Sequence, residues 1–347
     1  MKDYIIVGAG IAGISFAETC LTHHKSFVVF ENYSQQSSQV AAGLYNPIIL
    51  KRFSAVAGAQ SQLDLLHAFY SAIESRLNVK LNYNLPIFRK FFSVEEQNNW
   101  FVASEKISLT PFLSPVIKHN SISGINASFG FGQVLQTGYI DTSMLLKSYQ
   151  SNLLNQKLLI KEDFDYSALK IEDNFVRYKG IQARNIVFAE GFGIHANPYF
   201  NYLPLDGTKG ELLIIKAPNL DLNVVINSSI FILPLGNSYF KVGATYHWTD
   251  KTPEPTVEAR QELLDKIQET INCDFEIVDH QAGIRPTVKD RKPMIGQHTT
   301  FKNMYVLNGL GTRGVMLGPS MAKVLLEHIE HGIPIDKDID IKRFNKS

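Results

Sequence analysis

The sequence predicts an α/β protein in which a domain with a parallel sheet is interrupted by a second, β-rich domain of the α+β type. Three observations support this fold class. A strand pattern, a glycine-rich turn, a helix pattern and another strand pattern follow one another at the amino terminus. Short strand patterns dominate the middle of the chain, and a buried strand pattern with a glycine-rich turn returns near the carboxyl terminus. Helical patterns between them indicate that the first domain resumes after the β-rich stretches.

The amino-terminal stretch has the pattern of a Rossmann-like βαβ unit. An apolar run leads into Gly8, Gly10 and Gly13, and a second apolar run ends at Glu31. In such a unit the glycines allow the sharp turn, the approach of a pyrophosphate and the close packing of the helix on the strand. A carboxylate at Glu31 suits two ribose hydroxyls and repels a 2′-phosphate, so NADP is disfavoured. The pattern predicts a bound dinucleotide, with FAD and NAD both open.

The next elements are a polar loop at 32–39, a small-residue segment at 40–47 and a helix at 60–77. The small residues suit a backbone pressed against a flat ring system, and a simple helix start is the alternative. From 81 onward we expect strands at 85–92 and 128–135, with a short helix at 94–103.

A helix at 142–154, which Asp141 is placed to cap, marks the return to the first domain. Strand patterns follow at 157–160, 175–178 and 185–188, and the last of them enters a glycine turn. A second set of strands is expected at 204–215, 231–234 and 239–245, followed by a helix from Thr256 to about 271.

The chain then returns to the first domain through 282–286 and 293–296, and it ends in a strand and glycine turn at 303–319 and a helix at 320–331. We therefore expect a discontinuous cofactor domain at 1–80, 138–203 and 281–347, and a substrate domain at 81–137 and 204–280. The last glycine turn is a second helix start that favours anions, which suggests a ligand with two ends.

Bulk properties exclude several classes of function. The 347 residues carry a net charge of +1, so no global charge attracts nucleic acid or anionic lipid. Cys20 and Cys273 have no metal-ligand spacing, and we expect no metal site and a reducing compartment. No apolar run is long enough to cross a bilayer, and the first strand leaves no room for a signal peptide, so the sequence predicts a cytoplasmic protein.

Together these motifs resemble the D-amino-acid-oxidase-like family of FAD-dependent amine and amino-acid oxidoreductases. The resemblance includes the βαβ fingerprint with Glu31 and seven further segments in family order along nearly the whole chain. These segments are 41–47, 138–141, 187–191, 209–211, 242–245, 283–286 and the terminal glycine turn. The form of 310–314 is similar to the oxidase half of the bifunctional wobble-uridine tRNA modification enzymes.

The resemblance implies an FAD site whose residues come from every part of the first domain. The residues implied are Gly8, Ala9, Gly10, Ile11, Ala12, Gly13, Glu31, Asn32, Ala41, Ala42, Gly43, Leu44, Phe164, Ala189, Glu190, Gly191, Gly309, Leu310, Gly311, Thr312, Arg313, Gly314, Val315 and Met316. Glu190 departs from the family pattern, which usually has a small residue there. No Cys or His stands where relatives attach the ring covalently, so we expect non-covalent FAD.

Arg285 resembles the arginine that pairs with the substrate carboxylate in amino-acid oxidases, because a guanidinium donates two parallel hydrogen bonds. A structural arginine that bridges the domains is the alternative. Tyr246 and Lys209 are weaker candidates for lining the flavin or substrate face.

The expected activity is oxidation of the C–N bond of an amino acid or N-substituted amine by hydride transfer to flavin N5, followed by hydrolysis of the imine. Oxygen, a quinone or another carrier would accept the electrons. One alternative is a tRNA wobble-uridine carboxymethylamino oxidase, although the charge does not indicate tRNA binding. A non-catalytic flavin-binding module and an NAD-dependent dehydrogenase are the others.

Overall fold

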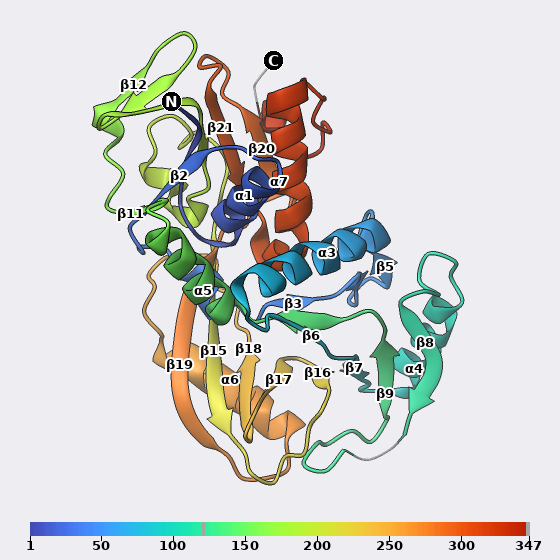
Figure 1. The fold of residues 1–347 in the computed structure, drawn as a ribbon. Coiled ribbons are helices and arrows are strands. Elements are labelled where there is room, and N and C mark those ends of the chain that lie inside the picture. The colour runs from blue at the N-terminus through green and yellow to red at the C-terminus, as the bar shows by residue number, and fades with distance from the viewer. Residues whose placement is uncertain (120–121, 345–347) are drawn as a thin grey trace.

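The computed structural model describes residues 1–119 and 122–344, and it is organised around two large sheets (Figure 1). The first sheet has eight strands, and five of them run parallel in the order β11, β2, β1, β14 and β21. Their bounds are Leu159–Lys161, Phe27–Glu31, Lys2–Val7, Ile181–Phe188 and Met304–Asn308. The antiparallel strands β12 (Leu169–Ile171), β13 (Val176–Tyr178) and β20 (Met294–Gln297) complete it.

Four helices gather beside the first sheet, and α1 and α7 pack on each other (Figure 1). They are α1 (Ile11–Thr22), α3 (Ala59–Leu77), α5 (Thr142–Asn155) and α7 (Gly314–His331). The Asp141 side chain accepts a 2.9 Å hydrogen bond from the Met144 backbone N–H, and this confirms the predicted cap of α5. Helix α7 begins earlier than the predicted 320, because the glycine turn itself is helical: it forms the short 3-10 helix η3 (Gly311–Arg313) and the first turn of α7.

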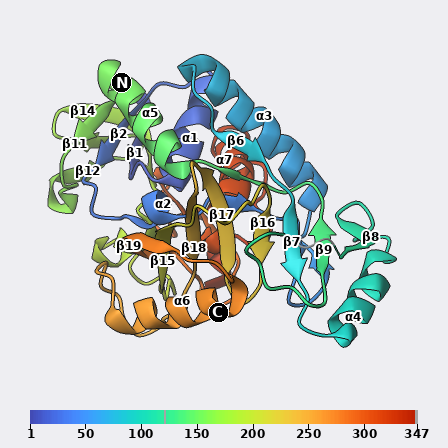
Figure 2. The ribbon, with the colours of Figure 1, turned by 90° about the horizontal axis from the view of Figure 1, so that it is seen from below.

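The second sheet also has eight strands, and only the β16–β7 pair is parallel. Its strands, in spatial order, are β19 (Glu276–Arg285), β15 (Thr208–Lys216), β18 (Tyr239–Gly243), β17 (Phe231–Gly236), β16 (Val225–Asn227), β7 (Ile87–Lys90), β9 (Phe131–Val134) and β8 (Leu113–Lys118). Helix α6 (Val257–Thr270) packs on β15 and β18, and α4 (Val94–Ser104) packs on β8, as Figure 2 shows from below. The Thr256 hydroxyl accepts from the Ala259 N–H, as the predicted cap requires.

Small elements join the two sheets. They are α2 (Ser37–Val40), β3 (Leu44–Tyr45), β4 (Ile48–Ile49), β5 (Ser54–Ala55), β6 (Asn82–Asn84) and β10 (Gly138–Ile140). Helix α2 lies within the stretch for which the sequence predicts a loop, and it packs on α5 and β19.

Alternation along the second sheet gives its two faces different roles. Leu213, Ile215 and Val242 belong to a core cluster with the apolar face of α6, whereas their neighbours on the same strands face the first sheet. Strand β19 stays in the second sheet as far as Arg285, which pairs with Thr208. We propose that the chain crosses back to the first domain after Arg285 and not at 281. Two short parts of the expected domains lie outside the described residues: 120–121 within the range 81–137, and 345–347 within the range 281–347.

Candidate functional site

A cavity of about 700 Å³ lies between the two sheets. From the first sheet it is lined by Val7, Phe30, Ala189 and Asn308, which stand at or just beyond the carboxyl ends of the parallel strands. In open α/β sheets this edge is where ligands bind. The opposite wall comes from the face of the second sheet that does not carry α6.

The turn from β1 into α1 is shaped by backbone contacts that leave no space for side chains. A Cβ at Gly13 would lie 1.8 Å from the Gly8 carbonyl oxygen, and a Cβ at Gly8 would lie 2.5 Å from the Ala189 carbonyl oxygen. Gly8 also has a φ of +101°, which side chains of L-residues rarely allow. Gly10 is the residue before α1 and has no side chain to cap the helix. Gly10, Ile11 and Ala12 line the cavity, so the start of α1 faces it. Such a helix start is suited to a phosphate.

Glu31 is the last residue of β2, beside this turn. Its carboxylate accepts hydrogen bonds from the Ala9 backbone N–H and, at 2.6 Å, from the Tyr33 N–H. Phe164 lines the same part of the cavity, and its ring stacks on Tyr178 with the centroids 4.2 Å apart. A carboxylate and an aromatic ring at one end of the cavity match what the adenosine half of a dinucleotide requires.

Glu190 forms the polar end of this region. Its carboxyl oxygens accept hydrogen bonds from the Tyr166 hydroxyl at 2.5 Å and from the Asn197 side-chain amide at 2.7 Å. Burial raises the pKa of Glu190 to about 7, although both hydrogen bonds favour the charged form.

The second glycine turn bounds another part of the cavity. Residues 310–315 line it, and the turn is fixed because the Asn308 side-chain amide donates to the Gly191 carbonyl oxygen at 2.8 Å. Two helix starts, those of α1 and α7, therefore face one cavity, as expected for a ligand with two ends.

Arg285 ends β19 with its guanidinium in the cavity wall. A Cβ at Gly210 would lie 1.9 Å from the guanidinium, so the absence of a side chain there provides its space. One guanidinium nitrogen donates to the Thr245 carbonyl oxygen at 3.2 Å, and the Tyr246 ring centroid lies 4.5 Å from the guanidinium carbon. No ion pair involves Arg285 in the described parts of the chain. Burial lowers the pKa of Arg285, but an arginine remains charged in proteins, so this cation lacks a protein anion.

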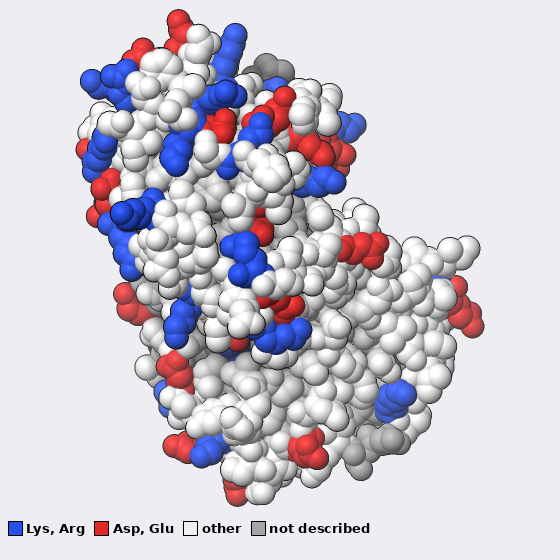
Figure 3. Space-filling model, in the orientation of Figure 1, with Lys and Arg blue, Asp and Glu red and all other residues white. Residues whose placement is uncertain are grey.

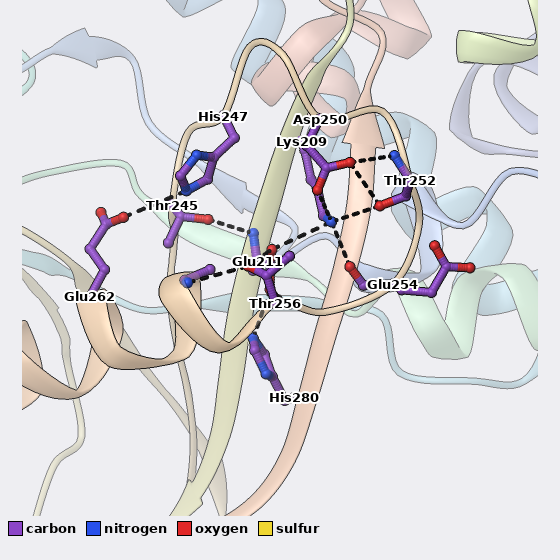
Figure 4. A network of polar contacts seen from close by, with 11 residues as sticks. Lys209, Glu211, Thr245, His247, Asp250, Thr252, Glu254, Thr256, Glu262 and His280 are labelled. Atoms are coloured by element: carbon purple, nitrogen blue, oxygen red, sulfur yellow. Dashed lines mark hydrogen bonds and ion pairs between the residues drawn. The ribbon is translucent and has the colours of Figure 1, made fainter.

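Lys209 lies on the other face of β15, away from the cavity (Figure 4). Its ammonium is fully buried and donates to Asp250 at 2.5 Å, to the Thr252 hydroxyl at 3.1 Å and to the Glu254 carbonyl oxygen at 2.5 Å. The neighbouring Glu211 accepts from the Thr256 backbone N–H at 2.8 Å. This network fixes the segment 245–256 to the second sheet, and Tyr246 belongs to that segment.

Most of the residues expected from the sequence line the cavity. Five do not: Ala9, Gly13, Lys209, Gly309 and Met316. Ala9, Gly13, Gly309 and Met316 are buried in the two glycine turns and the helix starts that follow them. The expectation that Lys209 faces the flavin or substrate does not agree with its place in the network.

The cavity also includes residues that were not among the expected site residues. The clearest are Asn46, Ile48, Ile87, Leu212, Asn227 and Phe231. Four of these lie on strands of the second sheet, where strand alternation places them on the cavity face. In the sequence, β15 and β17 read as unbroken apolar runs at 212–215 and 230–233, so the face that meets the first domain could not be predicted from them.

The residues present fit FAD. The structure provides two helix starts, a carboxylate at the adenosine end, and the small residues Ala41, Ala42 and Gly43 on the wall between them. Within the described residues, no three His, Cys, Asp or Glu side chains gather as metal ligands. None of the helices described here is both long and apolar enough to span a membrane.

Known proteins support this assignment. The sequence model of the family described as "FAD dependent oxidoreductase" (DAO) matches residues 3–328. Glycine oxidase of Bacillus subtilis is 21% identical over 94% of this chain and 92% of its own length. The crystal structure of glycine oxidase from Bacillus cereus superposes with a TM-score of 0.77, at 18% identity, over 97% of each chain.

A second kind of relative is longer than this chain. The tRNA 5-methylaminomethyl-2-thiouridine biosynthesis bifunctional protein MnmC of Marinobacter nauticus is 26% identical over 188 residues, which cover 48% of this chain and 30% of that protein. This chain therefore spans less than a third of that relative. Because the family match extends over nearly all of the chain and the cavity fits the cofactor, the chain belongs to the DAO family of FAD-dependent oxidoreductases.

Proposed function

We propose that this protein oxidises the C–N bond of an amino acid or N-substituted amine that carries a carboxylate. The observation that supports this proposal best is Arg285, a half-buried residue whose guanidinium lies in the cavity wall and has no carboxylate partner among the described residues. A cation of this kind is stabilised by an anionic ligand, and a guanidinium holds a carboxylate with two parallel hydrogen bonds.

The residues of the chain divide the work of binding and orientation. The starts of α1 and α7 and the Glu31 carboxylate would hold FAD without a covalent bond, and when bound FAD supplies a hydride acceptor. Arg285 would fix the substrate carboxylate, and thereby the adjacent carbon, in one orientation. Apolar walls at Leu212 and Phe231 exclude water from this part of the cavity. The neutral amine supplies the electrons, so no protein base is required, and water hydrolyses the imine to a carbonyl compound and an amine.

The alternative of a non-catalytic flavin module would require a closed cavity or an Arg285 held in a structural ion pair. The cavity volume supports an enzyme instead, as does the single hydrogen bond of Arg285, which goes to a backbone carbonyl oxygen and not to a carboxylate. A tRNA-borne substrate is suggested by the MnmC relatives and by the form of 310–314. On the face in Figure 3, positive and negative side chains are intermixed, and this does not favour an extended polyanion.

The first test is an anaerobic titration of the FAD-loaded protein with sarcosine and with sarcosinamide, in which the absorbance of the oxidised flavin is monitored. Wild type should be reduced by sarcosine, and Arg285→Gln should raise the sarcosine KM about 100-fold, because hydrogen-bonded charge pairs contribute roughly 3 kcal/mol. Sarcosinamide, which lacks the carboxylate, should respond little to the substitution.

The matched control is Arg184→Gln, which changes an exposed arginine outside the cavity. The proposal fails if the bound flavin is not reduced by any carboxylate-bearing amine. Equal losses for sarcosine and sarcosinamide would contradict the role of Arg285. Reduction by tRNA alone would favour the tRNA alternative.

A further inference from the structure

The cavity continues beyond Arg285 across the second sheet, and this arm is neutral. Leu212 pairs with Gly243, Gly243 with Phe231, and Phe231 with Asn227, so these residues form one row across four strands. Adjacent strands lie about 4.8 Å apart, and three spacings therefore span roughly 14 Å. Gly243 adds no side chain to the row, and the Phe231 ring lies over it: a Cβ at Gly243 would stand 3.2 Å from the ring and 2.9 Å from Leu212. Phe231 and Leu212 thereby form one continuous apolar floor.

Charges in the cavity wall lie elsewhere. The acidic residues of the wall are Glu31, Glu162, Asp163 and Glu190, all on the first sheet or just beyond its strand ends. Its cations are Arg285 and Arg313, and Arg313 belongs to the glycine turn before α7. Ile48 and Ile87 complete the walls of the arm. Two further cations lie behind the wall without lining it: Arg89 is paired with Glu96 at 3.2 Å, and Lys241 donates to the Ala41 carbonyl oxygen at 3.2 Å. Among the described residues that line the arm, none is a second cation that could bind a second carboxylate.

Two amides in this arm offer donors. The Asn227 side-chain oxygen accepts from the Arg89 guanidinium at 3.2 Å, and the Asn46 side-chain oxygen accepts from the Ile48 backbone N–H at 2.8 Å. Both partners can only donate, so the orientation of each amide is fixed. No acceptor in the described residues pairs with either NH₂ group. Each amide therefore presents its NH₂ donor as the group left for a ligand.

From these observations, and resting on the proposed function, we propose that the substrate is a monocarboxylate amine with an extended apolar substituent that ends in a neutral hydrogen-bond acceptor, such as a carbonyl oxygen. The carboxylate lies on Arg285, the apolar part lies along Leu212 and Phe231, and the acceptor meets Asn227. A substrate with a second carboxylate at the far end would bury an unpaired anion in this arm.

Three synthetic amines test the inference: N-(4-carbamoylbenzyl)glycine, its isostere N-(4-carboxybenzyl)glycine, and N-benzylglycine without an acceptor. The measurement is kcat/KM for anaerobic flavin reduction of the FAD-loaded protein, with Kd from calorimetry. The carbamoyl compound should exceed the carboxy compound by at least about tenfold, the size of one poorly satisfied polar group.

Asn227→Leu should lower kcat/KM for the carbamoyl compound about tenfold and leave N-benzylglycine within about twofold. Asn201→Leu, an exposed asparagine outside the cavity, is the matched control. Equal or better reduction by the carboxy compound would overturn the inference, as would equal losses for both substrates in Asn227→Leu. If sarcosine and all three amines leave the flavin oxidised, the proposed function itself fails, and this inference fails with it.

Discussion

At the scale of single residues, the site depends on groups whose charge is set by their surroundings. Arg285 keeps a positive charge in a half-buried place because Tyr246 and the Thr245 carbonyl oxygen partly replace water around it. Glu190 is the opposite case, since enclosure by protein disfavours its negative charge. A buried carboxyl group that resists ionisation lowers the free energy of unfolding at high pH. The pH dependence of unfolding can therefore reveal the raised pKa of Glu190.

Glu190→Gln should make the protein more stable above pH 7 and leave its stability near pH 5 almost unchanged. The pKa is raised from its usual value near 4.5 to about 7, so between these values the folded protein holds a proton that the unfolded chain has lost. Stability of the wild type therefore falls as pH rises through this window, by at most about 1.4 kcal/mol per pH unit. We expect a difference of about 2 kcal/mol at pH 8, measured by urea unfolding between pH 5 and 8.

The control for this experiment is Glu172→Gln, at an exposed position in a turn. Parallel pH profiles for wild type and Glu190→Gln would show that Glu190 has an ordinary pKa.

At the scale of elements, the glycines of the first turn have separable functions. Gly13 allows α1 to pack on the turn, because its Cα lies against the Gly8 carbonyl group. Gly10 contributes no such packing: its nearest neighbour would be the flexible Ser38 side chain at 3.0 Å. Gly10 lines the cavity, whereas Gly13 does not.

We expect Gly13→Ala to lower the free energy of unfolding by about 1 to 3 kcal/mol, as overpacking does. Gly10→Ala should preserve the stability of the FAD-free protein and raise the Kd for FAD at least about tenfold, because a methyl group would stand where the pyrophosphate approaches the backbone. Urea unfolding and fluorescence titration with FAD measure the two effects. Wild-type FAD affinity in Gly10→Ala would contradict this division of functions.

At the scale of the whole molecule, the cavity exists because two sheets meet, and the segment 245–256 secures one wall. Backbone hydrogen bonds of 2.9 Å join Lys209 and His247 in both directions, and the buried side chains of Lys209 and Glu211 hold the rest of the segment (Figure 4). Tyr246 is thereby kept beside Arg285.

Lys209→Met should lower the free energy of unfolding by about 3 kcal/mol, because Asp250 would lose its buried ion-pair partner and the buried Glu211 would keep only the His280 imidazole, at 2.9 Å, beside it. The hydrogen bond from Lys209 also lowers the pKa of Asp250, so the pair stabilises the protein above the ordinary aspartate pKa of about 3.9 and loses this effect as pH falls. The variant should therefore show a flatter loss of stability below pH 4. Urea unfolding at pH 3 to 7 measures both effects.

Lys216→Met on the same strand is the control, since Lys216 forms no ion pair in the described residues. A Lys209→Met protein as stable as this control would contradict the importance of the network.

Local patterns in the sequence determined much of the first domain. The βαβ turn, the carboxylate at Glu31 and the caps at Asp141 and Thr256 depend on neighbouring residues in the chain, and short-range backbone geometry is readable from residue types. Family resemblance added Arg285, which local patterns alone would not have distinguished from a structural arginine.

Only the tertiary structure decided which residues meet across the cavity. Lys209, Gly210 and Glu211 are all buried, so no hydrophobic alternation shows which of them faces the first domain. The face of each residue is determined by the neighbouring strand: β19 brings Arg285 over Gly210 and leaves Lys209 on the face of β15 that carries α6. In the same way, Asn227 becomes part of the cavity because β16 pairs with β17. Strand partners and faces follow from contacts between residues far apart in the chain, and for this reason the sequence determined the cofactor fingerprint while the packing of two sheets determined the substrate arm.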